Sequence, residues 1–328
     1  MNVNLPRRSF LAQSAAALVA AGSVGACSAS PSAADKQAPG GDAAAATGRR
    51  PNPIGVSSYS FWRYEEGREP PGMLWCIEQA AAMGFDGFEV LEIQMRRKDN
   101  PHVREIKRAA LLNGLNLCGL STHQGFVNPD PEVRQANFDK TLASLELAYD
   151  LGIPTIRVNT GRWGTSGNFN ELMANKGKEP TAKGYTDEQG FEWVINAYDR
   201  LAREAEARGI VMGLENHWGL GRDAVGVIRV IEAVNSPWLR ATLDTGNFLE
   251  DQYPQYEALA PYAVFVQAKT YFGGGVWYEL EIDYDRVAKM LTAADYHGYI
   301  SLEFEGRDEP RQAIPRSLAL LRQAFGSA

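Results

Sequence analysis

Four polar side chains lie near the ends of four successive strand-like segments, about one strand–helix unit apart. They are Glu215, Asp244, Gln267 and Glu303, in the segments VMGLENHW, RATLDTGNF, VFVQAKTY and YISLEFEG. If these segments are neighbouring strands of a parallel barrel, their carboxyl ends meet at one mouth and the four side chains can converge. Carboxylate and amide oxygens are the ligands that hard divalent cations prefer. The pattern therefore predicts a metal-binding active site with these four residues as ligands.

Alternation of side chains along the strands indicates that the polar groups face inward. Glu303 shares a face with Ser301 and Glu305, whereas Leu302 and Phe304 occupy the opposite face. The three other segments alternate in the same way. We therefore expect the polar faces to line the interior of a barrel and the apolar faces to pack against helices.

Carboxylates gathered at a barrel mouth repel one another and lose their hydration, which a divalent ion would offset. The oxygen-rich set favours Mn²⁺, Mg²⁺ or Co²⁺, with Zn²⁺ as the alternative ion. The competing interpretation is a network of buried salt bridges in which Arg157, Arg240 and Lys269 supply the positive charge. Lys269 follows Gln267 by two positions and should face the mouth, where a catalytic role in stabilising an oxyanion is open to it.

Eight strand-like runs alternate with helical runs between residues 54 and 325. We expect strands at 54–60, 88–93, 115–121, 155–159, 210–216, 239–244, 263–269 and 299–304. We expect helices near 71–83, 101–113, 132–151, 187–208, 223–235, 253–259, 284–295 and 314–325. Eight such pairs predict an α/β fold, a single-domain (β/α)8 TIM barrel. A doubly wound open sheet is the alternative, but no Gly-rich dinucleotide loop follows the first strand.

Two loops at the predicted mouth are candidates for substrate contact. The loop 160–186 is long enough to indicate a function and carries Trp163. The loop 272–283 contains Gly273–Gly275, whose conformational freedom would allow it to move as a lid. We expect Trp163 and Trp218 to contact a sugar ring, with packing as the alternative role of either side chain.

The motifs GLENH, LDTGN, QAK and SLEFE resemble those of the sugar phosphate isomerase/epimerase superfamily, which has a xylose isomerase-like TIM barrel. The resemblance covers roughly residues 54–325. It implies one divalent ion bound by Glu215, Asp244, Gln267 and Glu303, although Gln267 stands where the family usually has histidine. It also implies that Glu215 and Glu303 move a proton on opposite sides of the sugar carbon next to the carbonyl, which the metal polarises.

Four further residues near the expected mouth are candidates for contact with the substrate. His123 ends the third strand, where the family often places a substrate-contacting histidine, so we assign it to the catalytic group. His217, Arg157 and Glu305 are expected to bind the substrate. A structural histidine is the alternative interpretation for both His123 and His217.

The first fifty residues have a different composition from the rest of the chain. NLPRRSFLAQ is typical of a twin-arginine export signal, and the VGAC that follows resembles a lipobox that would be lipidated at Cys27. A soluble exported protein without the lipid is the alternative. We therefore predict a signal peptide at 1–27, a flexible linker at 28–52 and the barrel at 53–328, with the protein in the periplasm or anchored on the outer side of the membrane.

Charge argues against a nucleic-acid partner. The chain has 33 basic and 40 acidic residues, and five of the basic but only two of the acidic ones lie in the first fifty, which leaves a net charge of −10 on the remainder. An acidic surface repels a phosphate backbone. We therefore expect a small carbohydrate as partner and no nucleic acid. We expect contact with a membrane only through a lipid anchor. A homo-oligomer is compatible with the sequence, which does not fix the number of subunits.

These observations give three functional hypotheses. The leading one is a divalent-metal-dependent isomerase or epimerase of a sugar or keto-sugar that works through an enediolate. The alternative is a metal-dependent lyase or hydratase on keto-sugars or glycosides, because the same proton abstraction can expel a neighbouring substituent. From another class, a non-catalytic sugar-binding lipoprotein is compatible with the same residues.

Overall fold

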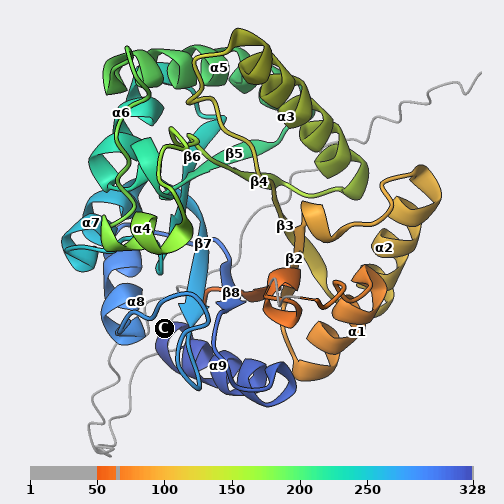
Figure 1. Cartoon of the computed structure of the whole chain (residues 1–328). Helices are drawn as coiled ribbons and strands as arrows, with labels where there is room; N and C mark the ends of the chain where they lie inside the picture. The colour runs from red at the N-terminus through yellow and green to blue at the C-terminus, as the bar shows by residue number, and fades with distance from the viewer. Residues whose placement is uncertain (1–49, 64–66, 327–328) are drawn as a thin grey trace, which may run out of the picture. The chain divides into compact units, whose positions relative to one another are not determined.

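The computed structural model describes residues 50–63 and 67–326, and it contains a closed barrel of eight parallel strands in sequence order (Figure 1). The strands are β1 (Ile54–Ser57), β2 (Gly87–Leu91), β3 (Asn116–Ser121), β4 (Thr155–Val158), β5 (Val211–Glu215), β6 (Leu239–Asp244), β7 (Ala263–Thr270) and β8 (Ile300–Phe304). Pairing of β1 with β8 closes the barrel. All eight predicted strands and the TIM barrel are confirmed.

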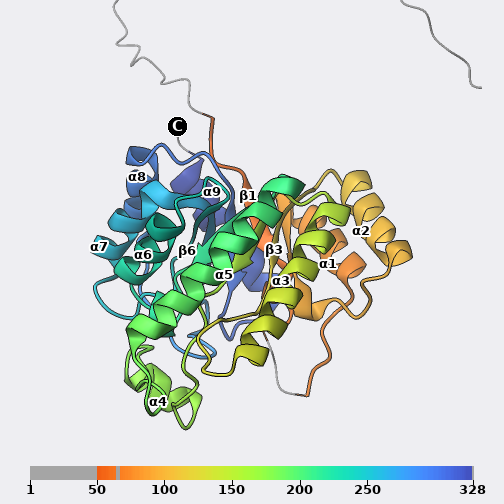
Figure 2. The ribbon, with the colours of Figure 1, turned by 90° about the horizontal axis from the view of Figure 1, so that it is seen from above.

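Helices surround the barrel and follow the predicted positions closely. They are α1 (Met73–Met83), α2 (Asn100–Leu112), α3 (Pro131–Leu151), α4 (Phe169–Ala174), α5 (Asp187–Arg208), α6 (Ala224–Val234), α7 (Gln252–Leu259), α8 (Tyr284–Ala293) and α9 (Pro310–Phe325). Short 3₁₀ turns occur at Ser58–Phe61, Glu92–Gln94, Gly219–Gly221 and Ala260–Tyr262. The sequence did not predict α4, which lies within the long loop after β4 and projects from one end of the barrel (Figure 2).

The main core lies between the barrel and the ring of helices. Leu302 and Phe304 on β8, and Val266 and Ala268 on β7, are fully buried there. Burial of such apolar area is worth about 25 cal/mol per Å² and fixes the register of each strand, because a shift by one residue would turn the polar face outward. The predicted division into an apolar outer face and a polar inner face is therefore confirmed.

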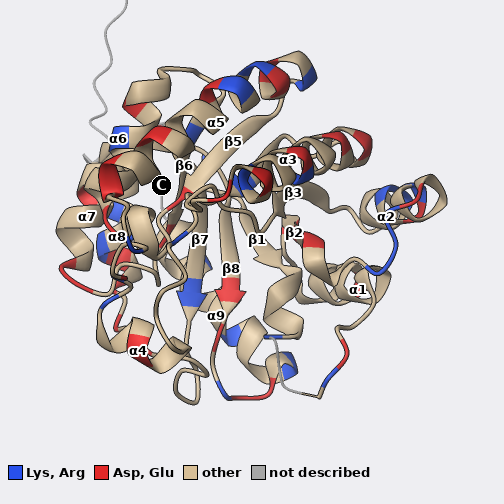
Figure 3. Ribbon diagram, turned by 45° about the horizontal axis from the view of Figure 1, so that its top comes forward, with Lys and Arg blue, Asp and Glu red and all other residues tan. Residues whose placement is uncertain are grey.

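Side chains of β7 fill the barrel in layers, from the amino end of the strand to its carboxyl end. Phe265 occupies the lowest of these layers, and Gly119 on β3 leaves it space, since a Cβ there would lie 2.9 Å from the ring. Gln267 lies above it and is completely buried. Lys269 forms the next layer, beside its register partner Glu303 on β8. Figure 3 shows this basic end of β7 next to the acidic end of β8.

Glycines at the helix ends explain how the chain turns back into the barrel. Left-handed backbone conformations occur at Gly84, Gly114, Gly152 and Gly209. After α8, Asp295 takes the left-handed conformation in place of a glycine. A Cβ at Gly298 would lie 2.5 Å from the Tyr296 hydroxyl oxygen. The tyrosine side chain therefore packs so close to this backbone that only glycine fits.

The predicted signal peptide, including Cys27, and most of the predicted linker lie outside the described residues. Among the residues that are described, no helix combines the length and the apolar composition needed to cross a membrane. Cys76 and Cys118 are buried free thiols, so the barrel has no disulfide between them.

Candidate active site

A cavity of about 500 Å³ opens at the carboxyl ends of the strands. Its lining side chains come from the strand ends and from the loops that follow them: Tyr59, Leu91, His123, Arg157, Phe169, Glu215, His217, Trp218, Asn247, Lys269, Trp277, Tyr278, Glu303 and Glu305. This volume is in the range of cavities that hold small ligands. Of the residues predicted to be catalytic, Glu215, Glu303, His123 and Lys269 all reach it.

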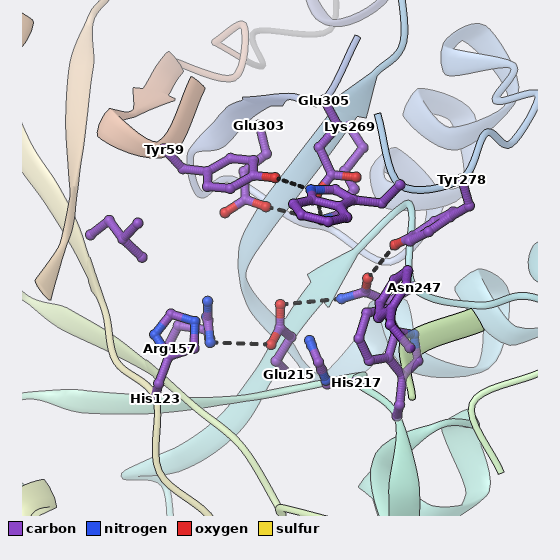
Figure 4. Close-up of a pocket in the computed structure, with 14 residues that line it drawn as sticks. Tyr59, His123, Arg157, Glu215, His217, Asn247, Lys269, Tyr278, Glu303 and Glu305 are labelled. Atoms are coloured by element: carbon purple, nitrogen blue, oxygen red, sulfur yellow. Dashed lines mark hydrogen bonds and ion pairs between the residues drawn. The ribbon is translucent and has the colours of Figure 1, made fainter. Parts of the chain in front are cut away.

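Glu215 and Glu303 lie on opposite sides of the cavity (Figure 4). The Glu303 side also holds Lys269, Glu305 and Tyr59, and the Glu215 side holds Arg157. Both glutamates end their strands, β5 and β8, and each is about 95% buried or more. Two carboxylates therefore face the same interior space from two directions.

The Glu215 side is a closed set of hydrogen bonds. Asn159 Nδ2 donates to Glu215 Oε2 at 2.6 Å, and Asn247 Nδ2 donates to Oε1 at 3.3 Å. The Arg157 guanidinium lies 3.5 Å from Oε2 and also donates to Asn159 Oδ1 at 2.9 Å. The Tyr278 hydroxyl in turn donates to Asn247 Oδ1 at 2.9 Å. Glu215 thus has a donor on each oxygen before any ligand arrives.

The Glu303 side has several carboxylates around one ammonium group. Lys269 Nζ lies 2.7 Å from Glu305 Oε1, 3.2 Å from Glu303 Oε2 and 3.4 Å from Asp244 Oδ2. Burial opposes a charged lysine, but the carboxylates of Asp244 and Glu305 prevail and raise the pKa of Lys269 well above its usual value. Burial likewise raises the pKa of Glu305, with Lys269 acting in the opposite direction. The carboxylates of this cluster thus favour the charged form of Lys269.

Asp244 and Gln267 lie below the cavity and do not line it. The Gln267 amide donates to Glu89 Oε1 at 2.7 Å, to Glu303 Oε1 at 3.0 Å and to Ser121 Oγ at 3.1 Å. Glu89 also accepts bonds from the hydroxyls of Ser121 and Ser301. Burial and the nearby Glu303 raise the pKa of Glu89 to about 7. Gln267 thus acts as a donor that positions carboxylates.

The two histidines near the mouth are held in the neutral form. Burial and the adjacent Arg157 lower the pKa of His123 to about 2 and lower that of His217 well below its ordinary value. A neutral imidazole offers one donor and one acceptor, which suits contact with a sugar hydroxyl. The side chains predicted to bind substrate, His217, Arg157, Glu305 and Trp218, all line the cavity.

Four aromatic side chains form a rim over the cavity: Phe169, Trp218, Trp277 and Tyr278. Phe169 lies edge-on to both tryptophans, with ring centroids 5.3 Å from Trp218 and 5.7 Å from Trp277. Trp163, predicted to contact the substrate, is not among the side chains that line this cavity. This indole packs against Trp193 and donates to Asp187 Oδ1 at 2.8 Å, because the loop after β4 folds it toward α5 rather than over the mouth.

The four predicted metal ligands do not fit a divalent cation in this arrangement. In the described part of the chain, no group of three or more His, Cys, Asp and Glu side chains is placed to hold a metal ion. Gln267 presents its NH₂ group to acceptors, and the Lys269 ammonium lies between the carboxylates of Asp244 and Glu303. A metal that used those carboxylate oxygens would have to share them with a positive charge, which Coulomb repulsion opposes.

Two of the three basic residues that the salt-bridge interpretation names, Arg157 and Lys269, form the expected ion pairs. Arg157 pairs with Glu215, and Lys269 pairs with the cluster around Glu303. Arg240 lies elsewhere, where it donates to the carbonyl of Pro261 at 2.8 Å.

Sequence reasoning missed several residues of the site. Tyr59, Asn247 and Tyr278 line the cavity but were not proposed as site residues, and Asn159 beneath them positions Glu215. Tyr59 and Asn159 lie at the carboxyl ends of the predicted strands 54–60 and 155–159, which is the signal that could have found them. Nothing local to the sequence connects Tyr278 with Asn247, because their contact joins two separate loops.

Similarity to known proteins agrees with this architecture. The xylose isomerase-like TIM barrel family matches residues 77–324, which is most of the chain. The chain belongs to this family. Among curated proteins, none is similar enough to count as a match.

Several solved structures have a similar fold. The apo form of 3-keto-D-glucoside 4-epimerase from E. coli is 19% identical, with a TM-score of 0.65 over 83% of this chain and 99% of that one. D-Psicose 3-epimerase from Clostridium cellulolyticum with D-tagatose is 17% identical, with the same TM-score and coverage. D-Allulose 3-epimerase from Methylomonas is 19% identical, with a TM-score of 0.58 over 83% and 90%.

Proposed function

We propose that this xylose isomerase-like TIM barrel is an isomerase or epimerase of a keto-sugar that moves a proton at the carbon next to the carbonyl. The observation that carries the proposal is the position of Glu215 and Glu303 on opposite sides of one cavity (Figure 4). A pair of carboxyl groups on the two faces of a substrate carbon can exchange a proton from one face to the other.

The proton balance of the reaction requires one carboxylate and one carboxylic acid at the start. The carboxylate removes the proton from the carbon beside the carbonyl, which gives an enediolate and a protonated side chain. The carboxylic acid then donates its proton to the opposite face of the same carbon, and the product is the epimer. Donation to the former carbonyl carbon, with a proton moved between the two oxygens, gives the isomer.

The rest of the cavity suits a sugar. Neutral His123 and His217 and the Arg157 guanidinium can contact hydroxyl groups, and the aromatic rim offers ring faces to the C–H side of a pyranose or furanose. The similar structures named above are epimerases of 3-keto-D-glucosides and of free ketohexoses. Those two classes are the first substrates to test.

Elimination is the second candidate, and the tyrosines of the cavity favour it. Tyr59 and Tyr278 both line the cavity, and a phenol carries its proton at neutral pH. A protonated phenol can give its proton to a departing β-substituent after a glutamate has removed the proton beside the carbonyl. A lyase or hydratase acting on keto-sugars or glycosides would use the same cavity.

Proton exchange in D₂O tests the proposal. The purified protein is incubated with 3-keto-glucosides and with 2-ketohexoses, and the products are followed by NMR. Deuterium at the carbon next to the carbonyl together with a new epimer or isomer supports the proposal, and an unsaturated product assigns the lyase alternative. Neither signal with any substrate, although the sugars bind, would leave a sugar-binding protein and overturn enzymatic function.

Metal dependence, with Mn²⁺, Mg²⁺ or Co²⁺ as the ion, remains a prediction of the sequence. The same incubations are carried out after dialysis against EDTA and again after each ion is added. A stimulation of tenfold or more by one ion would support that prediction.

We also propose export of this protein by the twin-arginine route, with lipidation at Cys27. The support is the segment NLPRRSFLAQ followed by VGAC. Replacement of both Arg7 and Arg8 by lysine should leave the protein in the cytoplasm, and Cys27→Ala should release the exported protein from the membrane fraction. Export of the double lysine variant would contradict the route.

A further inference from the structure

We infer that the Lys269 ammonium occupies the cation position of this active site, so that the protein supplies from its own chain the positive charge at the mouth of the barrel and needs no divalent metal. The inference about metal binding stands on the contacts of Lys269 alone. The part of it that concerns turnover rests on the proposed function.

Three carboxylates surround this ammonium at 2.7–3.4 Å, and two of them, Asp244 and Glu303, are among the predicted metal ligands. Asp244 Oδ2 has no hydrogen-bond donor in the described part of the chain, and its ion pair is with Lys269. The Lys269 side chain is about 7% exposed. The ammonium is therefore the charge that these buried carboxylates share.

The backbone around Lys269 is built to deliver it to this position. Its amide N–H donates to Thr245 Oγ1 at 3.0 Å, and its carbonyl accepts a bond from the Tyr284 hydroxyl at 2.6 Å. Both partners hold the carboxyl end of β7 against its neighbours. Lys269 is also the register partner of Glu303, which fixes the relative height of the two side chains.

Gly246 provides the channel for the stem of the lysine. A Cβ on Gly246 would lie 2.2 Å from Lys269 Cδ and 2.9 Å from Cγ, so any larger residue would displace the stem. The motif LDTGN thus places Asp244 and, two residues later, the gap that brings Lys269 to it. A residue chosen only to neutralise surface charge would not need such a channel.

The ammonium can do the electrostatic work of a cation during proton transfer. Lys269 lines the cavity beside Glu303, so an enediolate oxygen can bind there. An ammonium has three N–H donors, and Asp244 at 3.4 Å makes the longest of its three contacts. Because Lys269 lines the cavity, an N–H released from this long contact can bind a substrate oxygen above it, while Glu303 and Glu305 keep the ammonium in place.

Metal binding gives a readout that does not depend on finding a substrate. EDTA-dialysed wild-type protein is titrated with Mn²⁺, and bound ion is counted by electron paramagnetic resonance of the free Mn²⁺. We expect no stoichiometric site below about 1 mM in the wild type. Lys269→Met leaves Asp244, Glu303 and Glu305 without their cation and should gain one Mn²⁺ per chain, whereas Lys98→Met, at a half-exposed lysine, should gain none.

Two outcomes would overturn the inference. One is a single tight Mn²⁺ site in the wild type, and the other is a folded Lys269→Met protein that still takes up no Mn²⁺. The wild-type titration decides even if Lys269→Met does not fold, and Gly246→Ala, which displaces the stem, offers a second variant for the gain of binding.

Turnover supplies the second measurement. With the substrate found in the D₂O experiment, we expect EDTA to change the kcat of the wild type less than twofold, and Lys269→Met to lower it about 10²–10³-fold, as loss of an oxyanion donor does. Mn²⁺ should restore part of the rate only in Lys269→Met. A wild type that loses its activity in EDTA and regains it with Mn²⁺ would contradict the inference. Absence of turnover on every sugar would instead reject the proposed function and leave the Mn²⁺ titration valid.

Discussion

The two glutamates that face each other across the cavity are held in opposite ways. Glu215 receives donors from two asparagines and a guanidinium, so its surroundings are complete. Glu303 receives Gln267 on one oxygen and Lys269 on the other, but it shares this ammonium with Asp244 and Glu305, so acceptors are in excess around it. The comparison shows that the glutamate at the end of β5 has enough donors around it, whereas the glutamate at the end of β8 competes with other carboxylates for the same positive charge. Substrate hydroxyls, which bring donors, are expected to bind more strongly on the Glu303 side.

Removal of either carboxylate gives the largest expected effect. Glu215→Gln and Glu303→Gln should each lower turnover about 10²–10⁴-fold, the usual contribution of a positioned acid or base. The exchange of the substrate proton with D₂O should persist in each variant for the face served by the remaining glutamate. Stereospecific deuterium incorporation, followed by NMR, checks this. Glu257→Gln, at an exposed glutamate, is the control, and equal loss of exchange from both faces in one variant would contradict the two-sided arrangement.

Arg157→Met tests how completely the Glu215 side depends on its cation. Loss of one partner from a buried ion pair leaves an unpaired charge and costs about 3–5 kcal/mol. The free energy of unfolding, measured by urea denaturation, should fall by that amount. Arg316→Met removes a surface pair with Asp308 and should change it by less than about 1 kcal/mol. An effect of Arg157→Met as small as that of Arg316→Met would show that Glu215 is held by its asparagines alone.

Gln267→Leu tests the support beneath the Glu303 side. The substitution removes an NH₂ group whose two N–H bonds are shared among acceptors on Glu89, Ser121 and Glu303. Buried groups left unsatisfied cost about 1–3 kcal/mol, so the urea midpoint should fall accordingly. Gln135→Leu, at an exposed glutamine on α3, provides the matched control. An unchanged midpoint in Gln267→Leu would mean that these acceptors find other donors.

The pH dependence of stability gives the smallest expected effect. An unfolded histidine takes up its proton near pH ~6.5, whereas the folded His123 does so only near pH 2. The unfolded state therefore binds more protons between these values, and stability falls as the pH drops below about 6.5. His123→Gln should lose about 2 kcal/mol less stability than the wild type between pH 7 and pH 5, because each pH unit below about 6.5 costs about 1.4 kcal/mol when the folded histidine stays neutral. His297→Gln, at an exposed histidine, should follow the wild type, and identical losses in all three proteins would contradict a neutral His123 in the folded state.

The barrel was predictable because its signals are local and repeat eight times. Alternation of Ser301, Glu303 and Glu305 against Leu302 and Phe304 fixed the inward face of β8 in advance, and burial of the apolar set confirms it. Convergence at one mouth followed from the topology alone, since parallel strands bring their carboxyl ends together.

The identity of the cation was not predictable from spacing. Lys269, Gln267 and Glu303 were each expected at the mouth, but whether an ammonium or a metal lies between the carboxylates depends on the path of the lysine stem past Gly246. The positions of the loop side chains were not predictable for another reason. Trp163 turns away from the mouth and Tyr278 turns toward it because of contacts between residues far apart in the sequence, which alternation along a strand does not encode.

The loop after β7, expected as a free lid, is joined to the loop after β8. Gly275 and Gly306 form an antiparallel bridge, and the Val276 amide donates to the carbonyl of Glu305 at 2.9 Å. Trp277 at the rim and Glu305 beside the ammonium therefore belong to one small structural unit. If substrate specificity is to be exchanged between members of this family by loop grafting, both loops have to be transplanted together. Either loop alone would lack the bridge and the hydrogen bond that the other loop provides.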